Sequence, residues 1–379
     1  MDLKKLKQHI RTLATVEETT SPMISCYLNL ETGENQAAFE SRVRLLQKSL
    51  TDKELLDFQA AANQIREYLK ENANRESRGT AIFARGGDEP FFLPLQFRVP
   101  LPDWIAIGSS PNIYHLVELK DTYHRFVILI ATEEKARILE VNLGEVTTEL
   151  LRERPELIER FGRGWSKEHY QNHRRDRAEK FIKEKIQLLE KLMTAGGHTH
   201  LVLAGNPRIT ARVRQELPKH LAAKLVDTVV SSGDDRVSDV VTIALTAFVE
   251  REEQESRAVV EYLFDALHAN GLGTAGTAAT LWSLQRGSVD VLVMTKAFAP
   301  ETGWKCEHCQ QVGANRTRIE KCPGCGEQQL REIDLREEMT RLAEKSGCQI
   351  EVVNHSDRLM QFEGVGALLR FYSPEQYYS

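Results

Sequence analysis

Residues 304–326 read Trp-Lys-Cys-Glu-His-Cys-Gln-Gln-Val-Gly-Ala-Asn-Arg-Thr-Arg-Ile-Glu-Lys-Cys-Pro-Gly-Cys-Gly. This stretch contains two Cys-x-x-Cys pairs, Cys306/Cys309 and Cys322/Cys325, and twelve residues separate the pairs. Two such turns can direct four thiolates at one tetrahedral ion, so the spacing predicts a zinc ribbon at 300–331. Four protein ligands leave no open coordination position, which indicates a structural ion. A redox pair, two unrelated pairs or an iron site are the alternatives.

Length and composition describe a folded protein with room for several domains. The chain has 379 residues, 41% hydrophobic residues and only 12 prolines. No run reaches the roughly 20 apolar residues of a membrane span, and the first residues do not resemble a secretory signal, so we expect a cytoplasmic protein. Beyond the quartet, Cys26 and Cys348 lie in apolar stretches and are expected to be reduced core residues. The formal net charge is −5, so any nucleic-acid binding must come from a local basic patch.

Hydrophobic patterns predict an α/β protein with three domains, at residues 1–121, 122–233 and 234–379. The near-continuous apolar run Arg125–Ala131 is typical of a central strand, and Ser231–Asp235 is the best linker candidate. In the last domain, strand, helix and strand patterns follow one another at 289–294, 335–346 and 349–353. They predict a βαβ crossover into which the zinc ribbon is inserted.

A long helix is predicted at Ser166–Met193, because Ala178, Ile182, Ile186, Leu189 and Met193 recur at helical spacing. The segment from Arg160 to Lys191 holds ten Lys or Arg and five acids, and most of the excess charge lies in its first half. A helix N-terminus already favours phosphate, so a basic loop and first turns form a candidate footprint for RNA backbone. The candidate RNA-binding residues are Arg160, Gly162, Arg163, Gly164, Trp165, Ser166, Lys167, His169, His173, Arg174, Arg175 and Arg177.

Simpler interpretations of this segment stay open. Ser166 is a good helix cap, and a charged helix face is often merely solvated. Trp165 could stack on an unpaired base or pack back against its own domain. His198 and His200 flank Thr199 ahead of a buried strand; without a carboxylate near them in the sequence, a loop role is expected rather than a metal site. No nucleophile–base arrangement and no phosphate-binding loop is evident, so no catalytic residue is assigned.

The last third of the chain resembles a known family. The ordered series Gly271-Leu272-Gly273-Thr274, then Gly287-Ser288-Val289-Asp290-Val291-Leu292-Val293, the cysteine ribbon, and Phe362-Glu363-Gly364-Val365-Gly366-Ala367-Leu368-Leu369-Arg370-Phe371 resembles the C-terminal domain of class-one peptide release factors and Pelota. The preceding segments are similar to the bacterial archaeo-eukaryotic release factor families, which include the ribosome hibernation factor Balon. The resemblance implies a three-domain release-factor plan whose C-terminal α/β domain carries the ribbon.

At the position of the family's Gly-Gly-Gln loop this chain has Gly162-Arg163-Gly164-Trp165-Ser166-Lys167. Tryptophan cannot adopt glycine's backbone angles cheaply, and lysine cannot accept a hydrogen bond from water. Of the stop-codon loop, the best match, Phe39-Glu40-Ser41-Arg42-Val43, keeps only a Ser-Arg-Val portion. The resemblance therefore implies a ribosome-binding factor without the hydrolytic loop and without stop-codon reading.

By resemblance, the expected role is occupation of the A site of idle or stalled ribosomes, in hibernation or protection. The first domain would face the decoding centre and the Gly162–Lys167 loop the peptidyl-transferase centre. An EF-Tu-like GTPase is an expected partner, a membrane is not, and the factor would be a monomer off the ribosome. The alternatives are a peptidyl-tRNA hydrolase in ribosome rescue, acting through a variant loop, and a non-ribosomal RNA-binding or docking module.

Overall fold

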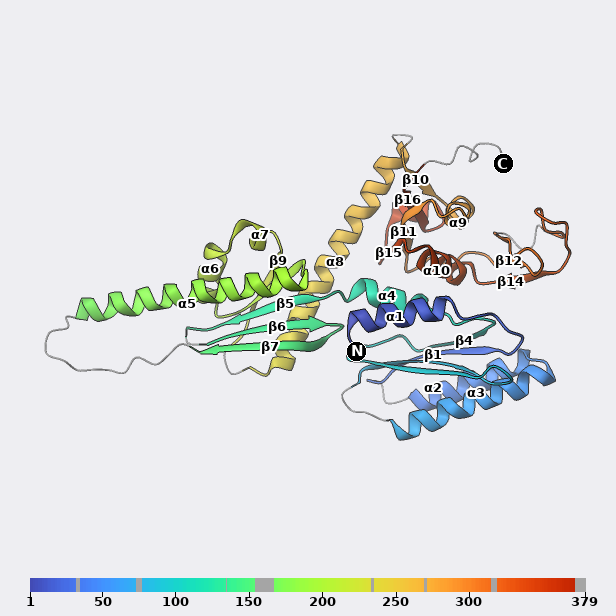
Figure 1. The fold of residues 1–379 in the computed structure, drawn as a ribbon, viewed down its shortest axis with the longest axis horizontal. Coiled ribbons are helices and arrows are strands. Elements are labelled where there is room, and N and C mark those ends of the chain that lie inside the picture. The colour runs from blue at the N-terminus through green and yellow to red at the C-terminus, as the bar shows by residue number, and fades with distance from the viewer. Residues whose placement is uncertain are drawn as a thin grey trace. The chain divides into compact units, whose positions relative to one another are not determined.

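A computed structural model describes residues 1–31, 35–72, 77–133, 135–153, 167–232, 235–268, 271–314 and 319–371, with the backbone alone at 35, 151–153 and 167–179. The chain divides into two compact units. Unit 1 comprises Leu3–Thr122 together with Glu253–Ser379, and unit 2 comprises Tyr123–Glu252. Figure 1 shows helices and sheets in both units, so the expected α/β fold class is confirmed. The three-domain boundaries stay a prediction.

The N-terminal segment of unit 1 forms an antiparallel sheet in the order β3-β2-β1-β4. Its strands are β1 (Met23–Asn29), β2 (Gly79–Arg85), β3 (Phe91–Phe97) and β4 (Trp104–Gly108). The helices of this segment are α1 (Leu3–Ala14), α2 (Asn35–Leu46), the 3₁₀ turn η1 (Gln47–Ser49), α3 (Asp52–Glu71) and α4 (Tyr114–Thr122). Phe39 of α2 and Phe58 of α3 are fully buried against Ile24 and Ile82 of the sheet, which places both helices on one face. Cys26 is a free thiol in this core, as expected.

The C-terminal segment of unit 1 forms a second sheet, in the order β10-β16-β11-β15. Its strands are β10 (Gly273–Ala275), β11 (Val289–Thr295), β15 (Gln349–Val353) and β16 (Val365–Leu369), and its helices are α9 (Thr277–Gln285), α10 (Leu335–Ser346) and α11 (Asp357–Met360). Strands β11 and β15 pair in parallel, with α10 between them in the chain. This confirms the predicted βαβ crossover. Cys348 is buried and free, as expected.

The cysteine stretch forms a separate three-stranded sheet within that crossover, in the order β13-β12-β14. Its strands are β12 (Gly303–Cys306), β13 (Val312–Gly313) and β14 (Leu330–Ile333), and both pairings are antiparallel. Trp304 is only 2% exposed and fills the small core of this sheet. Gly313 is required there, because a Cβ atom would come within 2.4 Å of the Trp304 ring.

Unit 2 is a sandwich of helix, sheet and helix layers. Its strands are β5 (Phe126–Ala131), β6 (Lys135–Asn142), β7 (Glu145–Glu153), β8 (His200–Gly205) and β9 (Leu225–Val230), in the order β7-β6-β5-β8-β9. Strand β5 is central and buried along its whole length, as the apolar run Arg125–Ala131 predicts. The helices are α5 (Lys167–Gly196), α6 (Pro207–Glu216), α7 (Lys219–Ala222) and the first half of α8 (Val237–His268).

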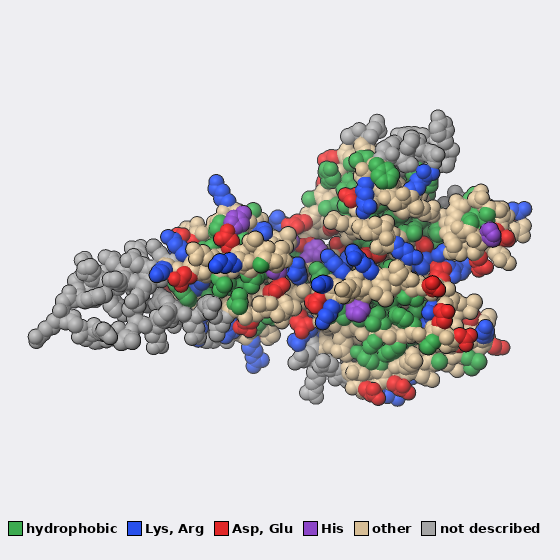
Figure 2. Space-filling view, in the orientation of Figure 1, with side chains coloured by type: hydrophobic (Ala, Val, Ile, Leu, Met, Phe, Trp, Pro, Cys, Tyr) green, Lys and Arg blue, Asp and Glu red, His purple; other side chains and the backbone are tan. Residues whose placement is uncertain are grey.

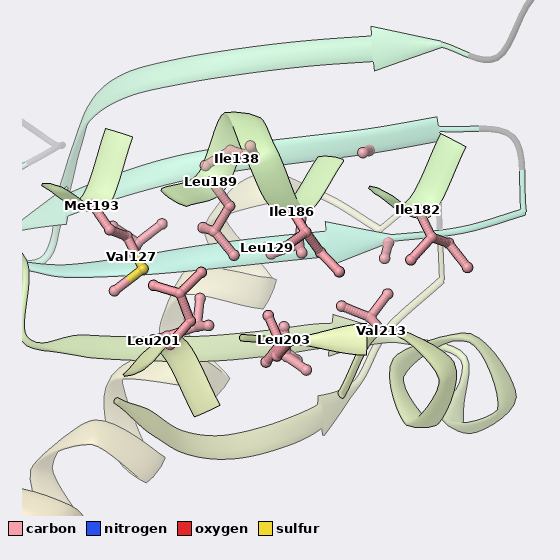
Figure 3. Packing of buried hydrophobic residues seen from close by; sticks show 14 of the residues in the cluster. Val127, Leu129, Ile138, Ile182, Ile186, Leu189, Met193, Leu201, Leu203 and Val213 are labelled. Atoms are coloured by element: carbon pink, nitrogen blue, oxygen red, sulfur yellow. The ribbon is translucent and has the colours of Figure 1, made fainter. Parts of the chain in front are cut away.

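Alternating residues of the central strands face two different helical layers. Val127, Leu129, Leu201 and Leu203 pack against α5, α6 and α7 (Figure 3). Phe126, Ile128 and Val202 pack against Val240, Val241, Ala244 and Phe248 of α8 on the other face. Within the described residues no helix is long and apolar enough to cross a membrane.

Candidate metal centre and RNA interface

Four cysteine sulfurs converge at one end of the ribbon sheet. The Sγ atoms of Cys306 and Cys325 lie 3.5 Å apart, as do those of Cys309 and Cys322. All four lie within 4.8 Å of one another. Four thiolates at about 2.3 Å from a central ion would have sulfur–sulfur edges of about 3.8 Å. The four sulfurs therefore converge, as the two Cys-x-x-Cys motifs predict, and they could hold one tetrahedral metal ion.

Both cysteine turns have the same local geometry. In each, the amide four residues after the first cysteine donates to that cysteine's carbonyl, from Gln310 to Cys306 and from Gly326 to Cys322. Each donor has a left-handed backbone, with φ 62° at Gln310 and φ 76° at Gly326. Such a turn brings its two sulfurs to the same side, and glycine adopts it at little cost.

Electrostatics at this site favour a cation. Burial opposes ionisation of Cys322, but N–H groups of Cys325 and Gly324 outweigh it and lower its pKa to about 7. A hydrogen bond from the Glu327 backbone favours the Cys325 thiolate, yet burial and the neighbouring sulfurs raise the pKa of Cys325 to about 12. Four thiolates this close repel one another, and a dication at their centre would relieve that repulsion.

The base of the ribbon carries an ionic cluster that the sequence does not reveal. The carboxylate of Glu18, in the loop after α1, lies 2.9 Å from Nζ of Lys305 on β12. Arg331 of β14 and Arg341 of α10 each approach it to 2.6 Å. Burial opposes ionisation of Glu18, but these three cations prevail and lower its pKa to about 2. Glu18 therefore ties the N-terminal segment to the ribbon and to α10.

A second carboxylate links the same two segments. Glu337 of α10 is buried and accepts hydrogen bonds from the backbone N–H groups of Ile113, at 2.6 Å, and Tyr114, at 3.1 Å. These amides open α4, where a negative charge complements the helix N-terminus. Burial nevertheless dominates and raises the pKa of Glu337 to about 8, against the effect of the two N–H donors. No local signal in the sequence distinguishes Glu18 or Glu337 from other acids.

The predicted RNA-binding residues fall at the edge of what the structure describes. Arg160, Gly162, Arg163, Gly164, Trp165 and Ser166 lie outside the described residues. Lys167, His169, His173, Arg174, Arg175 and Arg177 lie in α5, which confirms the predicted long helix, but their side chains are not described. The interface therefore stays a prediction.

The second half of α5 packs as its spacing predicts. Ile182, Ile186, Leu189 and Met193 are buried against the sheet (Figure 3). One of the basic residues counted in this segment does not contribute to its surface charge. Lys185 is only 2% exposed, and its Nζ lies 3.9 Å from the centre of the Phe181 ring and 3.2 Å from the carbonyl oxygen of Thr132.

The loop position expected for His198 and His200 holds for His198 only, because His200 begins strand β8. Both are buried, His198 just before β8 and His200 at its first position. Each has a carboxylate partner from another element, Glu140 at 3.5 Å from His198 and Glu252 at 3.3 Å from His200. Burial lowers the pKa of His198, although Glu140 opposes the effect. The pair is part of the packed end of the sheet, and its carboxylates are distant in sequence.

The stretch that best matches a stop-codon loop is helical. Phe39–Val43 lies inside α2, and Phe39 and Val43 are buried in the core of the N-terminal sheet. Nε of Arg42 donates to the carbonyl oxygen of Ile105 on β4, at 3.1 Å. These residues have structural roles in the fold.

Comparisons with known proteins agree with the resemblance. Residues 111–248 match the model of bacterial archaeo-eukaryotic release factor family 10. Peptide chain release factor subunit 1 of Pyrococcus abyssi is 23% identical over 418 residues, covering 97% of this chain and 98% of the relative. The same protein of Thermococcus onnurineus is 22% identical over 420 residues, with 98% of each chain covered.

Among solved structures, Pelota of Archaeoglobus fulgidus is 13% identical, with 98% of this chain and 92% of that chain covered and a TM-score of 0.40. This TM-score is too low to show that the two whole chains have the same arrangement of elements. The family match and these relatives support the expected resemblance to the bacterial archaeo-eukaryotic release factors, with the family model itself covering residues 111–248.

Proposed function

We propose that this protein is a translation factor that occupies the A site of idle or stalled ribosomes and protects them. The observation that carries this proposal is the loop Gly162-Arg163-Gly164-Trp165-Ser166-Lys167, which lies within the part of the chain that matches the release factor family. A release factor needs an amide side chain to orient water at the peptidyl ester. Here lysine stands at that position, and its ammonium group only donates hydrogen bonds.

The charge of the same segment supports binding to RNA. The sequence of α5 begins with Lys167 and continues with Arg174, Arg175 and Arg177, next to a loop that contains Arg160 and Arg163. Lysine and arginine side chains neutralise backbone phosphates without reading sequence, which suits a factor that must bind every ribosome. Domain 1–121 would face the decoding centre, and domain 234–379 would receive an EF-Tu-like GTPase. As part of this proposal, we expect the protein to be cytoplasmic and to be a monomer when it is not bound to the ribosome.

We propose zinc as the ion of the cysteine ribbon. Four thiolates in tetrahedral arrangement suit zinc among the common divalent metals, although iron binds the same set. Cys306, Cys309, Cys322 and Cys325 would hold it, and no position would remain for substrate. The ion would then stabilise a ribbon that has only a small hydrophobic core of its own.

Co-sedimentation tests the binding role. Purified protein is centrifuged with 70S particles and with separated 50S and 30S particles at moderate salt. We expect it to pellet with 70S, and we expect a variant with Arg163→Glu, Arg174→Glu and Arg175→Glu to bind more weakly. Protein that stays in the supernatant with every particle would contradict the proposal, and equal binding to unrelated structured RNA would favour a non-ribosomal module.

A release assay separates this role from rescue by hydrolysis. Ribosomes carrying labelled peptidyl-tRNA are incubated with the protein or with its Lys167→Gln variant. We expect no release of labelled peptide by the natural sequence, because its loop lacks the amide group. Release at a rate that Lys167→Gln does not increase would instead identify a peptidyl-tRNA hydrolase that uses backbone amides of the loop.

A further inference from the structure

A basic surface on α6 and α7 lies outside the predicted RNA-binding segment. The chain from Asn206 to Lys224 contains five Lys or Arg and a single acid, Glu216, in a protein whose net charge is −5. We define the α6 surface by its three exposed cations Arg208, Arg214 and Lys219. Within the described part of the chain, their side chains take part in no ion pair or hydrogen bond. Charges that the fold leaves unpaired are available to a ligand.

The fold orients this surface outward. Ile209, Val213 and Leu217 recur on one side of α6 and are buried in the core beneath it. Arg208 and Arg214 lie away from that apolar side, and Lys219 follows at the start of α7. Arg208 and Arg214 are six residues apart, which is about 9 Å along a helix. Figure 2 shows lysine and arginine side chains over the part of unit 2 that Figure 1 labels α6 and α7.

The α6 surface belongs to the same helical layer as α5. Residues of α5, α6 and α7 share one core against one face of the sheet. Their sequences together contain twelve Lys or Arg and six acids. The opposite layer is the first half of α8, where residues 237–252 contain one arginine and three acids. The two helical layers of unit 2 therefore differ in charge: the α5, α6 and α7 layer is basic and the α8 layer is acidic. A polyanion would approach unit 2 from the side of α5 and α6.

From this we infer that the α6 surface is a second contact for ribosomal RNA backbone, beside the one proposed for α5. The inference rests on the proposed function. The chemistry favours RNA over a protein partner, because the exposed residues of α6 are charged, polar or small, with no large apolar side chain. Protein interfaces typically have a buried apolar centre, whereas phosphate binding needs exposed guanidinium and ammonium groups.

The test compares two variants that lower the net charge equally. One carries Arg208→Gln, Arg214→Gln and Lys219→Gln on the α6 surface. The control carries Ser238→Glu, Thr242→Glu and Thr246→Glu, at exposed positions on α8. Binding to 70S particles is measured as a function of salt, and circular dichroism melting checks that both variants fold. We expect the α6 variant to bind at least about tenfold more weakly near 100 mM salt, with a salt slope smaller by about 2–3, and the control to bind like the natural protein.

Equal binding by the α6 variant and the natural protein would overturn the inference and leave the proposed function intact. An equal loss in both variants would also overturn it, since net charge alone would then explain the effect. Failure of the natural protein to bind ribosomes would instead refute the proposed function. Ultraviolet cross-linking identifies the ligand: the peptide containing Arg208–Lys219 should attach to ribosomal RNA, and attachment only to tRNA or to an acidic protein would contradict the assignment.

Discussion

The carboxylate of Glu337 accepts a hydrogen bond from the backbone N–H of Ile113, with 2.6 Å between Oε1 and the amide nitrogen. Glu337 belongs to α10, near the end of the chain, and Ile113 immediately precedes α4 in the N-terminal segment. A buried acid at a helix N-terminus thus joins two distant parts of the sequence. Its protonation has consequences for stability that can be measured.

Glu337→Gln should change the pH dependence of stability. Burial raises the pKa of Glu337 to about 8 in the folded state, above its ordinary value of 4.5. The folded protein therefore binds this proton more tightly than the unfolded chain does. The contribution of the protonated carboxyl to the free energy of unfolding is fully present below pH 4.5 and is lost as the pH rises through about 8. Relative to the natural protein, the variant should gain about 2–4 kcal/mol in unfolding free energy between pH 5 and pH 9.

Urea denaturation at several pH values measures this difference, and Glu332→Gln, at an exposed position on β14, is the matched control. Stability curves of Glu337→Gln and the natural protein that run parallel over this range would show that Glu337 does not titrate as inferred.

Glu18→Gln should destabilise unit 1 at neutral pH. The substitution leaves Lys305, Arg331 and Arg341 without their shared carboxylate, and loss of one partner from a largely buried ion pair costs about 3 kcal/mol. The pKa of Glu18 is lowered to about 2, so its contribution is present above pH 4.5 and lost as pH falls through about 2. The two proteins should therefore converge in stability at acid pH. Glu17→Gln, at the exposed neighbouring position, should be neutral.

Removal of metal should unfold the ribbon before the rest of unit 1. The ribbon has its own small core and its own sheet, so the β10-β16-β11-β15 sheet can persist without it. Elemental analysis should find about one zinc per chain, and Cys309→Ser should reduce that content. Trp304 fluorescence reports exposure of the ribbon core when a chelator is added, with Trp304→Phe as the reference. Metal-free protein after reducing purification, or loss of all ellipticity together with the Trp304 signal, would contradict this account.

Lys185→Met should weaken unit 2 without affecting RNA binding. The lysine ammonium donates to the Thr132 carbonyl at 3.2 Å, and methionine, which is one atom shorter, keeps the unbranched apolar part of the side chain while removing this donor. We expect a loss of about 1–3 kcal/mol in unfolding free energy, whereas Lys183→Met at an exposed position should cost little. Weaker ribosome binding with unchanged stability would mean that Lys185 contacts RNA.

Local patterns in the sequence predict much of the fold and the metal centre. The central strand β5, the buried stripe of α5 and the crossover from β11 to β15 follow from runs and periodicities of neighbouring residues. The four cysteines follow from the spacing of two short motifs. Each of these patterns lies within a short stretch of sequence, and the helix, strand or cysteine turn that it predicts depends on residues that are close together in the chain.

The rest depends on partners that are far apart in the chain. Glu18 and Arg331, like His198 and Glu140, meet only because the fold brings their elements together. A count of charges also treats every lysine alike, although Lys185 is buried. The charge of Asn206–Lys224 could have been counted from the sequence, but only the fold places it in the same layer as α5.

Electron cryo-microscopy of ribosomes pulled down with this protein from stationary cells tests the central claim most directly. We predict density for the factor in the A site, with Arg163 and Trp165 against ribosomal RNA at the peptidyl-transferase centre and no aminoacyl-tRNA in that site. Density for the factor elsewhere on the ribosome, or a Gly162–Lys167 loop packed against its own domain, would contradict the account.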